Sequence, residues 1–156
     1  MLKLDIGSGF AHGEDGWVGV DPFSSEADVR AFMWDLPYED NTVDEIFSSH
    51  SLEHIGKAQV PVTLREWFRV LKPGGKVTVR VPDLEWCVNH WLNHKYDTGW
   101  CIDIIFVNQN HEGEYHKTGF IEYTLKKYLT DVGFRITKFE ELNTHSQRTL
   151  SAECTK

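Results

Sequence analysis

The sequence predicts an α/β protein built on a doubly wound, Rossmann-like and mostly parallel sheet. A short apolar strand, Leu2–Ile6, runs directly into Gly7-Ser8-Gly9. A second strand, Trp17–Val20, ends on an acid, Asp21. Strand, crossover and strand then repeat along the chain, and an antiparallel strand pair closes it. Ligands of such sheets bind at the carboxyl ends of the strands, so these features also predict where a site lies.

The glycines and Asp21 favour a nucleoside as the ligand. A strand that ends in glycines leaves backbone N–H groups uncovered, so a ligand can lie against the main chain. A carboxylate at the tip of the next strand can accept hydrogen bonds from both hydroxyls of a ribose. The two strands therefore predict a nucleoside site at one edge of the sheet.

Length and composition limit the possible classes of protein. The chain has 156 residues, which predicts one domain over residues 1–156. A net charge of −8 argues against an extensive nucleic-acid surface. No apolar run is long enough to span a membrane, and a strand from residue 2 leaves no room for a signal peptide. Three scattered cysteines, Cys87, Cys101 and Cys154, are typical of reduced thiols in a cytoplasmic protein.

Further strands are predicted from short apolar runs bounded by turn residues. Only residues 7–17 separate the first two strands, and they include several glycines, so the first crossover is expected to be short and irregular. The remaining predicted strands are Ala27–Phe32, Val43–Ser48, Lys76–Val81, Phe134–Glu140 and Arg148–Cys154.

Three helices are predicted from apolar residues at helical spacing. The first is Lys57–Leu71, ended by Pro73-Gly74-Gly75. The second follows Asp83 as its N-cap, and the third is Glu122–Val132, ended by Gly133. No helix or strand is predicted for the polar segment 96–118. The residues expected to face inward are Val60, Leu64, Trp67, Phe68 and Leu71, then Leu84, Val88, Trp91 and Leu92, then Leu125, Tyr128, Leu129 and Val132.

Four motifs in order resemble a known family. Leu4-Asp-Ile-Gly-Ser-Gly9 and Val18-Gly-Val-Asp21 resemble the first two motifs of class I S-adenosylmethionine-dependent methyltransferases. The segments 35–55 and 65–77 resemble the motifs that follow, up to the fifth strand of that fold. The missing first helix and His116-Lys-Thr-Gly-Phe120 are similar to a compact, methyltransferase-11-like subgroup of predicted methyltransferases. Each motif alone is weak evidence, but four at the right spacing are hard to obtain by accident.

The resemblance implies S-adenosylmethionine as the cofactor. The glycine loop would approach the methionine part, Asp21 would hold the ribose, and Pro22-Phe23 would flank the adenine. The adenine edge would be read by 33–36, because Phe32 stands where family members often carry an acid. Ser49-His50 would face the sulfonium and its methyl group. The full predicted set is Asp5, Gly7, Ser8, Gly9, Asp21, Pro22, Phe23, Met33, Trp34, Asp35, Leu36, Ser49 and His50.

The predicted reaction is methyl transfer to a small-molecule or glycan-like acceptor. Transfer from a sulfonium is an in-line displacement, for which the protein mainly aligns donor and acceptor. A base is needed only where the acceptor atom must first lose a proton. His50, Asp83 and His116 are the catalytic candidates, with His111 and Tyr115 as further possibilities, and 108–116 is expected to border the acceptor. For Asp83, a helix cap is the favoured interpretation.

Three alternatives remain at the level of sequence. A nicotinamide-binding oxidoreductase would need G-x-G-x-x-G, but position 12 is His12. A non-catalytic module could retain the fold and the ligand. His50-Ser-Leu-Glu-His54 matches the H-x-x-E-H zinc pattern, but this pattern needs a helix that carries both histidines, so no metal is predicted. A homo-oligomer is possible.

Overall fold

The computed structural model describes residues 1–9, 16–94, 99–107, 109–110, 112–143 and 147–156. Its centre is one six-stranded sheet with the order β2-β1-β3-β4-β6-β5. The first four of these strands are parallel, while β6 is antiparallel to both of its neighbours, as predicted. The strands are β1 (Lys3–Ile6), β2 (Val18–Val20), β3 (Val43–Ser49), β4 (Leu71–Pro82), β5 (Arg135–Asn143) and β6 (Arg148–Thr155).

The order of the strands reverses at β1. The chain passes from β1 to β2 on one side and then returns to place β3 on the other side of β1. Such a switch point opens a crevice at the carboxyl ends of the two strands that flank it. These ends are Ile6 of β1 and Ser49 of β3, so the fold places the predicted ligand edge between the glycine loop and His50.

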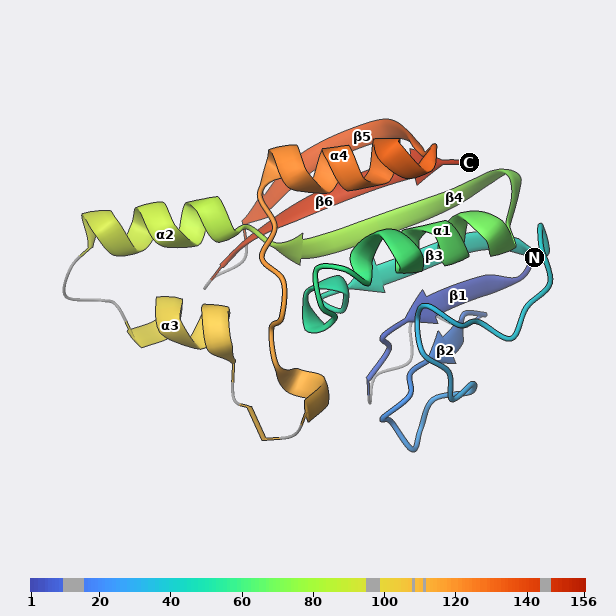
Figure 1. Ribbon diagram of the computed structural model, residues 1–156, viewed down its shortest axis with the longest axis horizontal. Coiled ribbons are helices and arrows are strands. Elements are labelled where there is room, and N and C mark those ends of the chain that lie inside the picture. The colour runs from blue at the N-terminus through green and yellow to red at the C-terminus, as the bar shows by residue number, and fades with distance from the viewer. Residues whose placement is uncertain (10–15, 95–98, 108, 111, 144–146) are drawn as a thin grey trace.

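Helices cover one face of the sheet. Figure 1 shows α1 (Val60–Val70) and α4 (Glu122–Val132) side by side on it, and the two helices contact each other. Alternate residues of β4, namely Val77, Val79 and Val81, are fully buried beneath them. The residues between, Thr78 and Arg80, are half-buried on the opposite, polar face. The alternation explains why this strand was predictable from its sequence.

The other helical elements lie at the carboxyl edge of the sheet. They are the 3₁₀ turns η1 (Leu52–His54) and η2 (Glu112–Glu114) and the helices α2 (Leu84–Asn93) and α3 (Gly99–Phe106). Figure 1 shows α2 and α3 projecting beyond the tip of β4. Within the described residues, no helix combines the length and apolar character that a membrane crossing requires.

One predicted strand is absent, and the bounds of several other elements differ from the prediction. Residues 27–32 form no strand: Val29 makes one isolated bridge to Val20, and the Asp28 carboxylate accepts the Gly19 N–H at 2.8 Å. A side chain that takes a backbone donor competes with the sheet ladder. Helix α1 spans Val60–Val70 and is shorter at both ends than the predicted helix 57–71; at its C-terminal end, Leu71 is already extended and pairs with Val43 as the first residue of β4.

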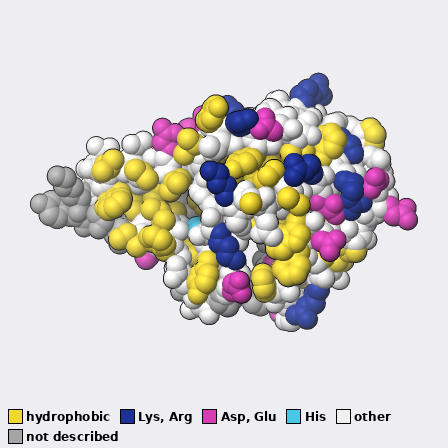
Figure 2. All heavy atoms as spheres, viewed as in Figure 1, with side chains coloured by type: hydrophobic (Ala, Val, Ile, Leu, Met, Phe, Trp, Pro, Cys, Tyr) yellow, Lys and Arg dark blue, Asp and Glu magenta, His cyan; other side chains and the backbone are white. Residues whose placement is uncertain are grey.

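The predicted inner face of α2 is wrong. Val88, Trp91 and Leu92 are 37%, 44% and 63% exposed, and the buried residue of this helix is Cys87. The helix leaves the tip of β4 and extends away from the sheet, so its later turns have no core to pack against. Its buried contact is with α3, where Cys87 and Cys101 each place Sγ 3.6 Å from the other's carbonyl oxygen. Figure 2 shows hydrophobic side chains gathered at this end of the molecule.

Both chain termini lie at the opposite edge from the ligand edge. Lys3 opens β1, and Thr155 at the end of β6 pairs with Lys76 near the start of β4. The Lys156 amide donates to the Gly75 carbonyl at 3.0 Å, and its Nζ donates to Asn41 Oδ1 at 2.7 Å. Figure 1 shows N and C on the same side of the molecule, away from α2 and α3.

Candidate active site

A pocket of about 300 Å³ opens at the switch point of the sheet. This volume lies at the lower end of the range of about 300–1,000 Å³ found for small-molecule sites. Loops after β1, β2 and β3 form its walls, and residues around η2 close one side. The lining residues are Gly7, Gly9, Asp21, Pro22, Phe23, Ser24, Phe32, Met33, Trp34, His50, Ser51, His54, Ile55, Gln59, Gly113, Glu114 and Lys117.

The glycine loop exposes its backbone to this pocket. Gly7 has φ +75°, and a Cβ there would lie 2.1 Å from Ser51 Oγ, so a side chain has no room. Gly9 has φ +60°, and a Cβ built on it would meet no atom of the described residues within 4 Å. The open space over Gly9 is where a ligand can approach the main chain. The loop therefore leaves room for the predicted approach of a ligand, which stays a prediction.

Asp21 lies on the wall and organises the loops around it. Its Oδ2 accepts the Gly9 N–H at 3.1 Å, and its Oδ1 accepts the N–H groups of Phe23 and Ser24 at 2.7 and 3.0 Å. A carboxylate offers about four acceptor positions, and described backbone N–H groups take three of them. Asp21 thus fixes the pocket's shape in addition to the ribose contact predicted for it.

An aromatic wall stands beside Asp21. Phe32 stacks on Trp34, with ring centroids 4.7 Å apart and 12° between the planes, and Phe23 meets Phe32 edge-on at 6.3 Å. Trp67 fixes this segment from α1, because its Nε1–H donates to the Met33 carbonyl at 2.9 Å. Phe32 was not predicted as a lining residue. The sequence did hold one indication of this role, because Phe32 stands at a position where an acid was expected.

Five residues predicted to bind the cofactor lie outside the pocket lining. Leu36 is buried in the core, where its N–H donates to Glu66 Oε1 at 2.8 Å, and Asp35 is exposed next to it. Asp5 is buried within β1, Ser8 follows that strand with a buried hydroxyl, and Ser49 pairs with Arg80 in the sheet. Their binding roles stay predictions.

His50 stands at the rim, in an unusual backbone conformation. Its φ is +53°, which is uncommon for a residue with a side chain and is often found at functional sites. The His50 N–H donates to the Arg80 carbonyl at 2.9 Å, which ties this turn to β4. Its Nδ1 lies 3.4 Å from Glu53 Oε1, and its Nε2 lies 3.4 Å from Thr149 Oγ1.

A second cavity of about 480 Å³ adjoins the first, and His50, His54 and Glu114 line both. Its remaining lining residues are Glu53, Pro82, Asp103, Ile104, Val107, His116 and Gln147. Burial lowers the pKa of His116, and the neighbouring His54 and His50 act in the same direction, while Glu53 opposes them. The shift favours the neutral imidazole.

The remaining catalytic candidates are placed differently. Asp83 lines neither cavity: its Oδ1 caps α2 by accepting the Trp86 N–H at 3.1 Å, and its Oδ2 pairs with Arg148 Nε at 3.2 Å. Tyr115 is exposed and also lines neither cavity. His111 and Asn108 lie outside the described residues. Within the described part of 108–116, Gly113, Glu114 and His116 lie at the two cavities, on the expected side of the sheet.

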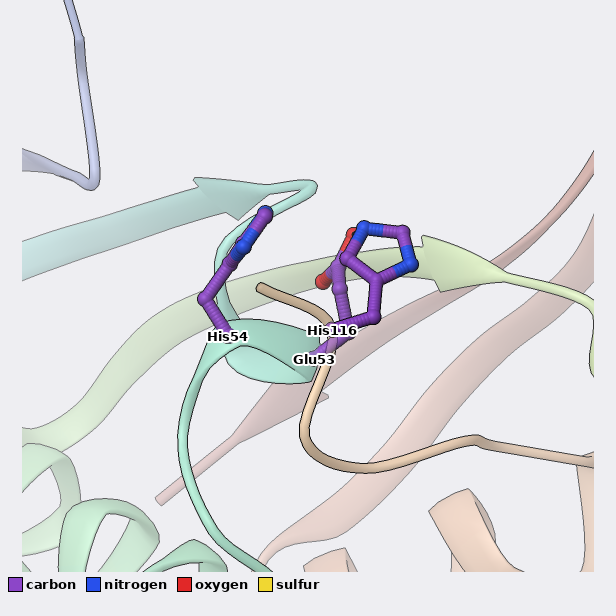
Figure 3. Close-up of side chains that lie close together, drawn as sticks. All are labelled: Glu53, His54 and His116. Carbon is purple, nitrogen blue, oxygen red and sulfur yellow. The ribbon is translucent and has the colours of Figure 1, made fainter. Parts of the chain in front are cut away.

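The H-x-x-E-H segment is a turn and not a regular α-helix. His50 precedes η1, while Glu53 and His54 belong to it. The possible ligand atoms of Glu53, His54 and His116 all lie within 4.8 Å of one another. Figure 3 shows His116 reaching this turn from a segment distant in the sequence. The sequence pattern therefore missed His116 as a member of the cluster.

Comparison with known proteins agrees with this geometry. A family model described as a methyltransferase domain matches residues 19–79. Demethylmenaquinone methyltransferase of Symbiobacterium thermophilum is 31% identical over 77 residues, which are 49% of this chain and 30% of that protein. Over these segments the chain is similar to methyltransferase domains. Because the match spans less than a third of that relative, the activity of this chain is argued below as a proposal.

Solved structures of methyltransferases share the fold of this chain. A Methanosarcina mazei S-adenosylmethionine-dependent methyltransferase is 19% identical with a TM-score of 0.69, over 99% of this chain and 91% of the other. A Burkholderia thailandensis 1,6-didemethyltoxoflavin N1-methyltransferase, solved with its acceptor and S-adenosylhomocysteine, is 14% identical with a TM-score of 0.70, over 99% and 70%. At these identities the likeness concerns the fold.

Proposed function

We propose that the chain binds S-adenosylmethionine in the glycine pocket and transfers its methyl group to a small-molecule or glycan-like acceptor. The observation that carries this proposal is the meeting of Gly9, Asp21 and His50 on one pocket at the switch point of the sheet. The methionine part lies along the glycine loop, the ribose at Asp21, and the adenine against Phe23 and Phe32. The donor methyl then points toward His50.

The acceptor enters through the second cavity. His50 and His54 line both cavities, so an acceptor atom there can stand in line with the donor's methyl–sulfur bond. The acceptor atom forms a bond to the methyl carbon as the carbon–sulfur bond breaks, and the sulfonium becomes a neutral thioether. Where the acceptor is a hydroxyl, the imidazole of His50 stands close enough to the point of transfer to accept its proton.

The lining of the second cavity favours an uncharged polar acceptor. Three carboxylates, Glu53, Asp103 and Glu114, disfavour an anion, while Ile104 and Val107 provide apolar contact. Among the similar proteins, the demethylmenaquinone and didemethyltoxoflavin enzymes are named for small-molecule acceptors. Both observations support a small polar acceptor, with a hydroxyl or an amine as the reacting group.

Calorimetry with S-adenosylhomocysteine and with NAD tests the donor site. We expect S-adenosylhomocysteine to bind and NAD not to bind. Asp21→Ala should weaken the affinity roughly ten- to a hundredfold, since bonds to charged groups contribute about 1.5–3 kcal/mol and about 1.4 kcal/mol is tenfold. Asp131→Asn, on the exposed side of α4, is the matched control and should change nothing. Binding of NAD alone, or full affinity in a folded Asp21→Ala protein, would overturn the proposal.

A further inference from the structure

Glu53 is a buried carboxylate with no hydrogen-bond partner among the described residues. The residue is 1% exposed, and neither of its side-chain oxygens makes a hydrogen bond within the described residues. Nδ1 of the adjacent His54 is also buried without a hydrogen bond in the described part of the chain. Burying a carboxylate away from water is costly unless a counter-charge or hydrogen bonds compensate it. A bound cation would compensate the Glu53 carboxylate and give His54 Nδ1 a partner.

The surroundings of Glu53 are imidazoles. His50 Nδ1 and His116 Nε2 lie 3.4 and 3.9 Å from Glu53 Oε1. The rings of His54 and His116 meet edge-on, with centroids 4.7 Å apart. Figure 3 shows Glu53 and His54 on one turn with His116 across from them. One carboxylate with several imidazoles is a set of donors that transition metals prefer.

Backbone contacts hold the two halves of this cluster together. The N–H groups of Lys117 and Thr118 both donate to the Glu53 carbonyl, at 2.8 and 3.1 Å. Thr118 Oγ1 donates to the Ile55 carbonyl at 2.7 Å. These bonds fasten the segment that carries His116 to η1. The cluster is thus built into the fold and does not depend on flexible surface side chains.

We propose that Glu53, His54 and His116 bind a divalent transition-metal ion between the donor pocket and the second cavity. Two imidazoles and one carboxylate form the three-ligand set of catalytic zinc sites, which keep further positions open. Two donors on one tetrahedral zinc lie about 3.3–3.4 Å apart, given bonds of about 2.0–2.1 Å. The donors here lie within 4.8 Å, so binding draws them together through side-chain rotation. Magnesium prefers oxygen ligands and is disfavoured by this set.

The ion has a role in the reaction if the proposed function holds. Its place at the junction of the two cavities lets an acceptor hydroxyl occupy an open position. Coordination makes a hydroxyl easier to deprotonate, and the proton leaves to water through the second cavity. The oxygen then bonds to the donor methyl as the carbon–sulfur bond breaks. Coordination also holds the acceptor oxygen beside His50. The metal site therefore favours oxygen acceptors over amines.

Titration calorimetry with Zn²⁺ and Mg²⁺ on chelator-treated, full-length protein tests the site. We expect one equivalent of Zn²⁺ to bind, and Mg²⁺ not to bind. Glu53→Gln and His116→Ala should each weaken Zn²⁺ affinity by more than about 100-fold, since loss of even an outer-shell partner costs about 10–100-fold. Co²⁺ should give the visible absorption bands of a low-coordinate site, and these should vanish in both variants.

The control removes two histidines elsewhere. His90 and His94 stack on α2 with centroids 4.0 Å apart, and the double variant His90→Ala/His94→Ala should keep full Zn²⁺ affinity. Zn²⁺ binding that is lost in this control, or that persists in folded Glu53→Gln and His116→Ala proteins, overturns the proposal. If Glu53→Gln fails to fold, the Zn²⁺ affinities of folded His116→Ala and His54→Ala proteins test the site in its place. S-adenosylhomocysteine binding is measured in parallel, so a failed donor site is distinguished from a failed metal site.

Discussion

Gly7 and Gly9 both have left-handed backbones, but only Gly7 is crowded. A Cβ on Gly7 would lie 2.1 Å from Ser51 Oγ, whereas a Cβ on Gly9 would face open pocket space. The left-handed conformation costs about 1–2 kcal/mol for a residue with a side chain. The two glycines therefore serve different ends: Gly7 permits close packing, and Gly9 permits ligand approach.

Alanine at each glycine should separate these roles. Gly9→Ala should lower the free energy of unfolding by about 1–2 kcal/mol and impair S-adenosylhomocysteine binding. Gly7→Ala should lower the stability further, because the Ser51 side chain and its turn must move. Urea unfolding and calorimetry measure the two effects. Equal stability losses, or unchanged binding in Gly9→Ala, would contradict this account.

The cysteines should be unreactive in the native protein. Burial raises the pKa of Cys154 to about 12, and burial together with Cys101 raises that of Cys87 to about 12. The thiolate is the reactive form, so alkylation near pH 8 should be slow until urea unfolds the chain. Unfolding returns the two thiols to their ordinary pKa near 9. The folded state therefore keeps the stability that these neutral thiols contribute below about pH 9, and it loses that stability as the pH rises from about 9 to 12. Mass spectrometry after timed iodoacetamide treatment measures the reactivity; rapid labelling of folded protein would refute the prediction.

At the scale of elements, the sequence predicted best where a segment packs on the sheet. Helix α4 has the predicted bounds, and Gly133 ends it at φ +113°. The helix α3 was missed, because Gly99–Phe106 is apolar nearly throughout and has no amphipathic period. The inner face of α2 was wrong because periodicity shows which residues share a face but not whether a core lies there. The single domain, the cytoplasmic location and a homo-oligomer stay predictions.

The residues of the site also divide into those that local sequence predicts and those that depend on the fold. Local motifs predicted the glycine loop, Asp21 and His50, which line one pocket, because each follows directly from a strand end. Glu53 and Phe32 were missed as site residues: Glu53 belongs to an H-x-x-E-H pattern from which no metal site was predicted, and Phe32 replaces an expected acid. His116 was predicted, but its pairing with Glu53 joins segments far apart in the chain, which spacing along the sequence does not show.

The Asp83 cap sets the start of α2. Asp83→Asn keeps a cap oxygen and loses the ion pair with Arg148, while Asp83→Ala loses both. We expect Asp83→Ala to lose about 1 kcal/mol more than Asp83→Asn, the usual contribution of a cap. Thermal unfolding measures this difference. Because Asp83 lines neither cavity, S-adenosylhomocysteine affinity should stay unchanged in both; a marked loss in either folded variant would place Asp83 in the donor site.

At the scale of the molecule, stability should be graded across the sheet. β4 lies between β3 and β6 and is bonded on both sides, whereas β2 is a three-residue edge strand. Amides in the centre of β4 and β6 should exchange with solvent only on global unfolding, and those of β2 through local opening. Native-state hydrogen exchange followed by NMR measures this order. Protection of β2 equal to that of β4 would contradict it.

The placement of the two termini decides how this protein can be handled. Both ends lie at the edge of the sheet opposite the two cavities. A chain fixed to a sensor surface through either end should therefore turn its cavities toward the flowing solution. The N-terminal end is the better choice for a fusion or an affinity tag, because Lys156 is itself bonded to Gly75 and Asn41. Acceptor libraries can accordingly be screened on tethered protein without covering the place where they would bind.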